Sequence, residues 1–328
     1  MSFPSGDSGF TGSPFSPEAF EPSYTVPAQP RKFQSRLWLH ALLFLLTLAT
    51  TTYTGAGHYH AFRDAFAGTD VALDWPLFVN GLWYSGTILA ILGAHEMGHY
   101  VLCRRYRVDA TLPYFIPAPL PLTGTLGAVI KIREAFPTRA ALFDIGIGGP
   151  IAGFVVLVPA LFIGLSLSTI VPEPTHLENL IELGEPLLFQ WATTMMFGEL
   201  PSGTTINMHP MVFAAWFGML ATALNLLPFG QLDGGHITYA TVGRYSTPIS
   251  VATVGIAVAM TFVSASWIFM TIMMVVMLLV LGPRHPRVIY EHEALGGGRI
   301  WLAVAAFVIL AVCFTPVPIE PYDLVRNP

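Results

Sequence analysis

Charged side chains are scarce in this chain. Asp, Glu, Lys and Arg make up 11% of its 328 residues, whereas soluble domains carry roughly 25%. Hydrophobic residues make up 53%, and the mean hydropathy is +0.60. This balance excludes an ordinary soluble protein and predicts an integral membrane protein. The basic residues form no cluster, so the sequence gives no sign of a nucleic-acid partner.

Cysteine is nearly absent. Cys103 and Cys313 are the only two, and each lies within or beside an apolar segment. Two isolated cysteines support neither a disulfide framework nor a thiolate metal site. We therefore expect both thiols to be buried.

The first 30 residues contain no Lys or Arg but are rich in Pro, Ser and Gly. Such a composition cannot build a packed core and predicts a disordered tail. The segment lacks the basic start and apolar centre of a secretory signal, and its acidic residues are atypical of an organellar transit peptide. We predict three parts: a tail at 1–30, a polytopic membrane domain at 31–316 with its core at 76–240, and a C-terminal tail at 317–328.

Long apolar runs follow the tail, and each is near the ~20 residues that a helix needs to cross a bilayer. They lie at residues 37–56, 76–102, 140–170, 208–229, 249–282 and 299–315. The fifth run is either one tilted helix or a hairpin broken near Ser264. The sequence thus predicts an all-α polytopic membrane protein of six to seven transmembrane helices, with a small membrane-associated β-hairpin.

The basic residues are unevenly placed along the chain. Three precede the first run and six lie between residues 104 and 139, whereas segment 171–207 has five glutamates and no Lys or Arg. By the positive-inside rule, the N-terminus and segment 104–139 face the cytoplasm and segment 171–207 lies outside. Basic residues on both sides of 249–282 favour the hairpin. We expect a prokaryotic cytoplasmic membrane as the location.

Two histidines and a glutamate interrupt the second apolar run, in the motif HEMGH at residues 95–99. A helix places His95 and His99 on one face, one turn apart, which suits two zinc ligands. Glu96 lies beside the first ligand, where it can act as a general base. Ionisable groups are costly at membrane depth, so a functional site is favoured over a structural role. A catalytic zinc site needs a third protein ligand.

The candidate for that ligand is Asp233, the only acidic residue between Glu199 and Glu291. Pro228 and Gly230 precede it, so a helix cannot continue unbroken through this segment. Irregular backbone at membrane depth is tolerated only where it is buried in protein or lines a polar cavity. Such a break would point Asp233 at the metal. Taken alone, the segment fits an ordinary loop aspartate beyond a span equally well.

The motifs together resemble the paired signature of the site-2 proteases, which are intramembrane zinc metalloproteases. HEMGH matches the H-E-x-x-H half, and residues 225–234, NLLPFGQLDG, match N-x-x-P-x-x-x-L-D-G at every defining position. Gly148-Gly149-Pro150 is similar to a third, weaker family feature. The resemblance covers about residues 85–240.

This resemblance implies an intramembrane zinc endopeptidase with one Zn²⁺ per chain. The implied metal ligands are His95, His99 and Asp233. Glu96 would be the catalytic acid and base, and Asn225 would donate to the substrate or the developing oxyanion. The implied substrates are single-span membrane proteins within the lipid bilayer; the sequence does not define the oligomeric state.

A strand pattern lies between the second and third runs. Prolines at 113, 117, 119 and 121 forbid a long helix, and residues 125–133 alternate, with Leu126, Ala128, Ile130 and Ile132 on one face. An exposed edge there could pair with an unwound substrate by strand addition, as family members are thought to do. An ordinary cytoplasmic hairpin is the alternative.

Two other functions fit parts of the pattern. A metal transporter could use the same ligands for transit but does not need Glu96, and an inactive scaffold would tolerate loss of Glu96 or a ligand. Many bacterial family members carry a PDZ domain between the motifs, but the interval 104–208 has no polar segment long enough for one. His236, just after the LDGG run, could line the site, but a supporting role behind the ligands or a position at the membrane interface is favoured.

Overall fold

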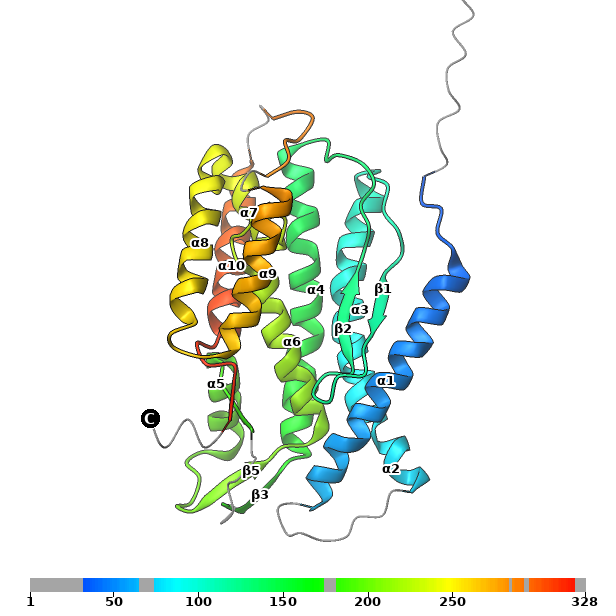
Figure 1. Cartoon of the computed structure of the whole chain (residues 1–328), viewed down its shortest axis with the longest axis vertical. Coiled ribbons are helices and arrows are strands. Elements are labelled where there is room, and N and C mark those ends of the chain that lie inside the picture. Colours follow the sequence, from blue (N-terminus) through cyan, green and yellow to red (C-terminus); the bar gives the residue numbers. More distant parts are fainter. Residues whose placement is uncertain (1–31, 65–73, 174–180, 283–284, 292–294, 322–328) are drawn as a thin grey trace, which may run out of the picture. The chain divides into compact units, whose positions relative to one another are not determined.

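The computed structural model describes residues 32–64, 74–173, 181–282, 285–291 and 295–321 (Figure 1). The predicted tail at 1–30 lies outside the described residues, as do residues 322–328. The described chain is mostly helical, with three pairs of short strands. This confirms the predicted helical class with a small β element.

Three helical segments in the described ranges are long and apolar enough to cross a membrane. The first is α1 (Leu37–Asp64), which continues well beyond the predicted end at residue 56. The second joins the short α2 (Trp75–Asn80) to α3 (Leu82–Arg105), and the third is α4 (Arg139–Ser166). Each coincides with one of the first three predicted runs.

Shorter helices complete the bundle: α6 (Pro210–Leu226), α7 (Asp233–Val242), α8 (Ser246–Met260), α9 (Ser266–Leu281) and α10 (Gly297–Cys313). A 3₁₀ turn, η1 (Gly243–Tyr245), joins α7 to α8. The long run at 249–282 is a hairpin, because α8 and α9 pack together and turn at residues 261–265. The backbone N–H of Ser266 donates to Ser264 Oγ in this turn, at 3.2 Å. The hairpin interpretation is therefore confirmed.

The strands form three separate antiparallel pairs. They join β1 (Tyr114–Pro117) to β2 (Thr125–Val129), β3 (Thr169–Pro172) to β5 (Thr204–Asn207), and β4 (Ile181–Leu183) to β6 (Ile319–Pro321). Helix α5 (Leu187–Phe197) lies between β4 and β5. The strands β3, β4 and β5 and helix α5 were not predicted from the sequence, because these strands pair with partners distant in sequence.

The bundle places the oppositely charged segments at opposite ends. In Figure 1 the start of α1, the end of α3 and the start of α4 lie at one end, whereas β3 and β5 lie at the other. The basic ends of α3 and α4 thus lie away from the strands β3 and β5. This is the separation that the positive-inside argument requires.

Helices α3 and α4 approach to backbone contact. A Cβ placed on Gly98 would lie 2.3 Å from the carbonyl oxygen of Gly148, and one on Gly148 would lie 2.2 Å from Leu102 Cδ1. Small residues permit this close packing within a membrane. The contact sets α4 directly against the face of α3 that carries the HEMGH motif.

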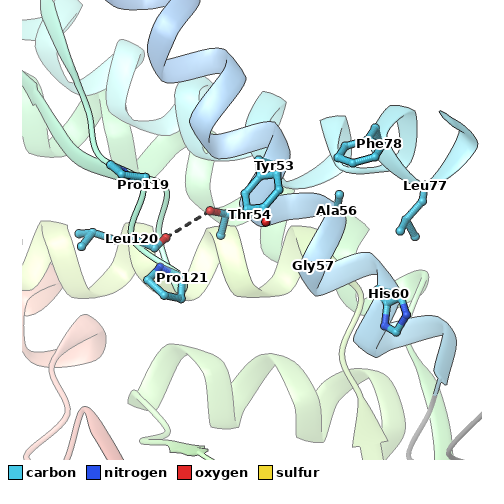
Figure 2. A pocket seen from close by; sticks show the side chains of 10 residues that line it. All are labelled: Tyr53, Thr54, Ala56, Gly57, His60, Leu77, Phe78, Pro119, Leu120 and Pro121. Atoms are coloured by element: carbon cyan, nitrogen blue, oxygen red, sulfur yellow. Dashed lines mark hydrogen bonds between the residues drawn. The ribbon is translucent and has the colours of Figure 1, made fainter. Parts of the chain in front are cut away.

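The loop between β1 and β2 is held on α1 and α3. Thr54 Oγ1 donates to the carbonyl oxygen of Leu120 at 3.2 Å (Figure 2), and Tyr84 Oη donates to that of Thr123 at 3.0 Å. A cavity of about 470 Å³ lies beside the first bond, between α1, α2 and this loop. No predicted metal ligand lines that cavity, so it is separate from the predicted site.

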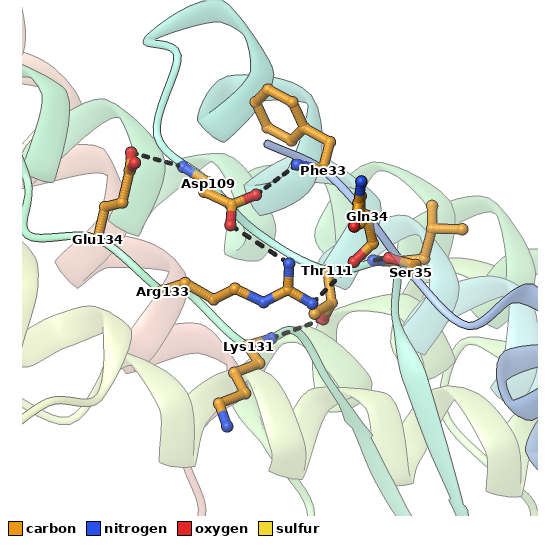
Figure 3. Close-up of polar contacts among 9 residues, drawn as sticks. Phe33, Gln34, Ser35, Asp109, Thr111, Lys131, Arg133 and Glu134 are labelled. Carbon is orange, nitrogen blue, oxygen red and sulfur yellow. Dashed lines mark hydrogen bonds and ion pairs between the residues drawn. The ribbon is translucent and has the colours of Figure 1, made fainter. Parts of the chain in front are cut away.

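The base of the same hairpin is held by a polar network (Figure 3). The Asp109 carboxylate accepts from the backbone N–H of Phe33 and, at 3.3 Å, from Arg133 Nη1. Arg133 Nη2 donates to the Gln34 carbonyl at 2.8 Å, and the backbone N–H of Asp109 donates to Glu134 at 3.1 Å. The tip of the hairpin is therefore fixed to α1 and α3, and its base to residues 33–34 just before α1.

The predicted faces of β2 are wrong at its start. Leu126, expected on the buried face, is 66% exposed, whereas Thr125 is 7% exposed. The pairing with β1 is irregular between Phe115 and Pro117, and Thr125 turns inward, where its hydroxyl donates to the Ile116 carbonyl at 2.8 Å. Such an irregularity disrupts the strict alternation of a strand.

Candidate metal centre

The two histidines of HEMGH point to the same place. His95 and His99 lie one turn apart on α3, each is only 7% exposed, and their Nε2 atoms are 3.1 Å apart. Two imidazole nitrogens this close in a buried position would be unfavourable without a shared proton or a cation between them. The arrangement is therefore compatible with a cation bound between the rings.

A break in the helix brings the third residue to them. Helix α6 ends at Leu226, and Leu227 adopts an extended conformation (φ −56°, ψ 133°), as expected for the residue before a proline. The turn is closed by backbone bonds from Phe229 N–H to the Leu227 carbonyl at 2.7 Å and from Leu232 N–H to the Phe229 carbonyl at 3.1 Å. Helix α7 then begins at Asp233. The predicted interruption before Asp233 is confirmed.

The Asp233 carboxylate meets both imidazoles. Its Oδ2 lies 3.1 Å from His95 Nε2, and its Oδ1 lies 3.3 Å from His99 Nε2. Zinc–nitrogen distances of about 2.0–2.1 Å in a tetrahedral site imply ligand atoms roughly 3.3 Å apart. Across the described ranges, this is the one group of three or more His, Cys, Asp or Glu residues whose ligand atoms converge. The three residues therefore fit a zinc ion.

The main chain of α4 orients one of the ligands. His99 Nδ1 lies 2.6 Å from the carbonyl oxygen of Ile145. A carbonyl can only accept, so Nδ1 carries the proton and Nε2 keeps its lone pair for a metal. Gly149 lies against the same ring, because a Cβ there would be 2.1 Å from His99 Nε2. No sequence pattern identifies the Ile145 carbonyl in advance.

A cavity of about 240 Å³ adjoins the cluster. Glu96, His99, Asn225 and Asp233 line it. Residues 128–130, at the end of β2 and just after it, also line the cavity. Glu96 is 8% exposed, and the backbone of Ile130 hydrogen-bonds to its carboxylate. A general base beside a metal site needs this proximity to the reacting water.

The structure thus brings all five predicted residues together. The role of Asn225 was predicted from the family resemblance alone. Its Nδ2 lies 3.4 Å from His95 Nε2, and the residue also lines the cavity. It is close enough to the cluster to reach a group bound there. The catalytic roles of Glu96 and Asn225 stay predictions.

Sequence reasoning missed one partner at the cavity edge. His236 lines the cavity, and its Nδ1 lies 2.7 Å from Nε2 of His285. His285 follows α9 in the polar stretch GPRHPR, so its position next to a membrane helix was a usable signal. No spacing rule links it to His236, because His236 lies on α7 and His285 lies in the segment after α9.

Comparison with known proteins gives consistent matches. The model of peptidase family M50 matches residues 83–268. The Arabidopsis thaliana protein "Probable zinc metalloprotease EGY1, chloroplastic" is 30% identical over 231 residues, which cover 63% of this chain and 41% of that protein. The Oryza sativa subsp. indica protein "Probable zinc metalloprotease EGY2, chloroplastic" is 30% identical over 258 residues, covering 76% of this chain and 45% of that protein.

The chain spans less than half the length of these two relatives. No solved structure matches it significantly.

Proposed function

Because this chain belongs to peptidase family M50, the family of the site-2 proteases, we propose that it is an intramembrane zinc endopeptidase. It hydrolyses peptide bonds within or near the transmembrane segments of membrane proteins. The observation that carries this proposal is the convergence of His95, His99 and Asp233 beside a cavity lined by Glu96. The zinc metalloprotease names of the relatives support it.

The chain's own residues divide the chemistry between them. Zinc bound at this cluster would act as a Lewis acid: it would lower the pKa of a water molecule toward about 7 and polarise the scissile carbonyl. The Glu96 carboxylate takes the proton of the attacking water and gives it to the leaving nitrogen. The Asn225 amide donates a hydrogen bond to the oxygen that becomes negatively charged.

The free edge of β2 offers a place for the substrate backbone. The Lys131 carbonyl accepts from the Thr111 N–H, and the Arg133 N–H donates to the Asp109 carbonyl, both in the neighbouring segment that leads into β1. Backbone groups alternate in direction along a strand, so those of Ala128 and Ile130 turn away from that neighbour. Residues 128–130 line the metal cavity. An unwound substrate that pairs with this edge places a peptide bond near Glu96.

A second cavity extends this path. It measures about 250 Å³ and lies between residues 125–127 of the hairpin and the apolar side chains Phe217 and Leu224 of α6. Its apolar lining suits the side chains of a transmembrane substrate, whereas the strand edge suits its freed backbone groups. An unwound substrate helix would thus find an apolar cavity for its side chains next to a strand edge for its backbone groups.

We expect Ala128→Pro to lower cleavage about tenfold or more, because it removes the backbone N–H that faces the free edge. Edge positions tolerate proline, so zinc content should stay unchanged. Initial rates and bound zinc should be measured on purified protein in lipid vesicles. Ala128→Val is the control, since it keeps the N–H and should cleave within about twofold of wild type. Equal rates for both variants would exclude strand addition at this edge.

The proposed membrane arrangement has seven spans. The helices α6, α8, α9 and α10 are added to the three long segments, with the N-terminus and the opening of the metal cavity on the cytoplasmic side. The separation of basic and acidic segments supports this orientation. The relatives named above are described as chloroplastic, which favours a chloroplast membrane and does not support the predicted prokaryotic cytoplasmic membrane.

The proposed substrates are single-span membrane proteins. Between the two motifs the described residues form the end of α3, the β1–β2 hairpin, helices α4, α5 and α6 and short strands, with no unit of the size of a PDZ domain among them. We propose that the hairpin and the adjoining cavity contribute to substrate choice. We propose no nucleic-acid partner.

Metal removal tests the proposal directly. Wild type in lipid vesicles should hold about one zinc per chain and cleave a single-span substrate, lose cleavage after a chelator, and recover it with added zinc. Asp233→Ala should lose both zinc and cleavage, because it removes a ligand. If wild type binds zinc, cleaves no substrate and instead carries zinc across the vesicle membrane, the proposal is wrong and the protein is a transporter.

A further inference from the structure

A pair of histidines outside the metal cluster lies at the edge of the metal cavity. His236, on α7, lines the cavity, and its ring packs edge-to-face on Phe136 with centroids 5.6 Å apart. A Cβ on Gly146 would lie 2.9 Å from His236 Cβ, so α4 packs directly against the base of this side chain. His285 contacts His236 from the segment that follows α9.

The segment that carries His285 is held in place from two sides. The backbone N–H groups of Ile289 and Tyr290 donate to the carbonyls of Phe136 and Pro137 at 3.0 and 2.8 Å. The His285 ring stacks on Tyr239 with centroids 4.4 Å apart and planes 18° apart. His285 is therefore a fixed partner for His236.

The partners of the two rings determine where their protons sit. His285 Nδ1 lies 2.7 Å from the carbonyl oxygen of Pro286, which can only accept, so Nδ1 carries a proton. Burial lowers the pKa of His285, which favours the neutral ring, and the Nε2 of a neutral ring with a protonated Nδ1 is an acceptor. His236 Nδ1, 2.7 Å from this Nε2, must then be the donor.

This order leaves a lone pair on His236 Nε2. A neutral imidazole carries one proton, and here it is on Nδ1. Within the described ranges no hydrogen bond is formed by Nε2, and the side chain lines the cavity. His236 Nε2 is thus a hydrogen-bond acceptor of fixed orientation in the cavity, and it is not one of the predicted metal ligands.

We propose that His236 is a substrate-binding residue, whose Nε2 accepts a hydrogen bond from a backbone N–H of the unwound substrate. His285 is a positioning residue that keeps the proton off Nε2. This inference rests on the proposed proteolytic function. A substrate strand paired with β2 has backbone N–H groups on its other edge as well, and these need acceptors away from water.

The other polar side chains of the cavity cannot replace it. Asp233 and His99 face the metal position, and Glu96 is needed for the proton of the attacking water. Asn225 lies at the metal cluster, 3.4 Å from a ligand nitrogen. Gln231 also lines the cavity, but it is exposed, so water competes for its amide oxygen. His236 is the less exposed cavity residue left to accept from the substrate backbone.

Two substitutions of His236 separate its two nitrogens. An Asn amide lies as many bonds from Cβ as Nδ1, so His236→Asn keeps a bond to His285 but loses the acceptor in the cavity. A Gln amide lies as far as Nε2, so His236→Gln keeps an oxygen at that place. Binding of a single-span peptide should be measured in the zinc-loaded Glu96→Gln protein, where hydrolysis does not interfere.

We expect His236→Asn to weaken peptide binding about 10- to 100-fold, the cost of an unsatisfied buried N–H, and His236→Gln to weaken it less than about fivefold. A peptide with an ester in place of the bonded amide lacks the N–H. It should bind more weakly to the parent protein than the amide peptide does, and equally to the His236→Asn protein. If the two substitutions have equal effects, or no ester position distinguishes the proteins, the proposal is wrong.

The positioning role of His285 has its own readout. Nitrogen NMR of ¹⁵N-histidine protein in lipid should show His236 protonated on Nδ1 in the wild type. His285→Arg offers only donors, so it should move that proton to Nε2 and weaken peptide binding as much as His236→Asn does. His285→Gln offers a carbonyl and should restore both.

A wild-type His236 signal with the proton on Nε2 would overturn the proposal even if cleavage is normal. Absence of cleavage by the wild type, with the expected tautomer and with peptide binding sensitive to His236→Asn, would instead refute the proposed function alone.

Discussion

Glu96→Gln should leave about one zinc bound per chain and lower cleavage of a single-span substrate by roughly a thousandfold. The substitution keeps the shape of the side chain, and its amide oxygen can still accept the hydrogen bond from the Ile130 backbone. It alters none of the three residues that converge on the metal position. What it removes is the ability to take a proton from the attacking water.

The measurement combines zinc content with initial rates in lipid vesicles. Glu199→Gln, which makes the same chemical change between α5 and β5, outside the metal cavity, is the control and should match wild type in both. A Glu96→Gln protein that holds zinc and cleaves at more than about a tenth of the wild-type rate would show that another group is the base. Loss of zinc from Glu96→Gln would instead make Glu96 part of the metal site.

Gly149→Ala should abolish zinc binding and, with it, cleavage. The new Cβ would lie 2.1 Å from His99 Nε2 and 2.5 Å from its Cδ2 and Cε1, far inside contact distance. The His99 ring cannot give way without losing either the Ile145 carbonyl or the metal position. Removing one ligand from a three-residue site leaves two, too few for a stable catalytic zinc.

Zinc per chain, measured after purification in lipid or mild detergent, checks this result. Gly93→Ala on α3 is the control, because its Cβ would meet only Phe115 Cζ at an ordinary 3.6 Å, and this variant should retain zinc. Thermal unfolding of both variants separates a folded protein without zinc from an unfolded one. Full zinc occupancy in Gly149→Ala would show that His99 does not bind the metal through Nε2.

Periodicity and motif spacing predicted the parts of this structure that depend on neighbours in sequence. The i, i+4 spacing of His95 and His99 follows from helix geometry, and the Pro and Gly residues around Asp233 predicted the break that the structure has. Basic residues on both sides of 249–282 favoured the hairpin that forms there. Each of these features is determined within a few tens of residues.

The features that escaped prediction depend on contacts between distant segments or on the main chain. The Ile145 carbonyl that orients His99 carries no side-chain signature. The inward turn of Thr125 depends on an irregular register with β1, which alternation of residue types cannot show. His285 meets His236 only because the segment after α9 returns to the loop before α4.

The order of the metal ligands along the chain determines when the metal site can form during synthesis. Two ligands lie on α3, whereas the third appears only after α4, α5 and α6 have been added. A chain still emerging from the ribosome therefore has Glu96, the proposed base, but an incomplete set of metal ligands. Under the proposed function, such a chain is inactive toward neighbouring membrane helices until α7 has docked and Asp233 completes the set of metal ligands.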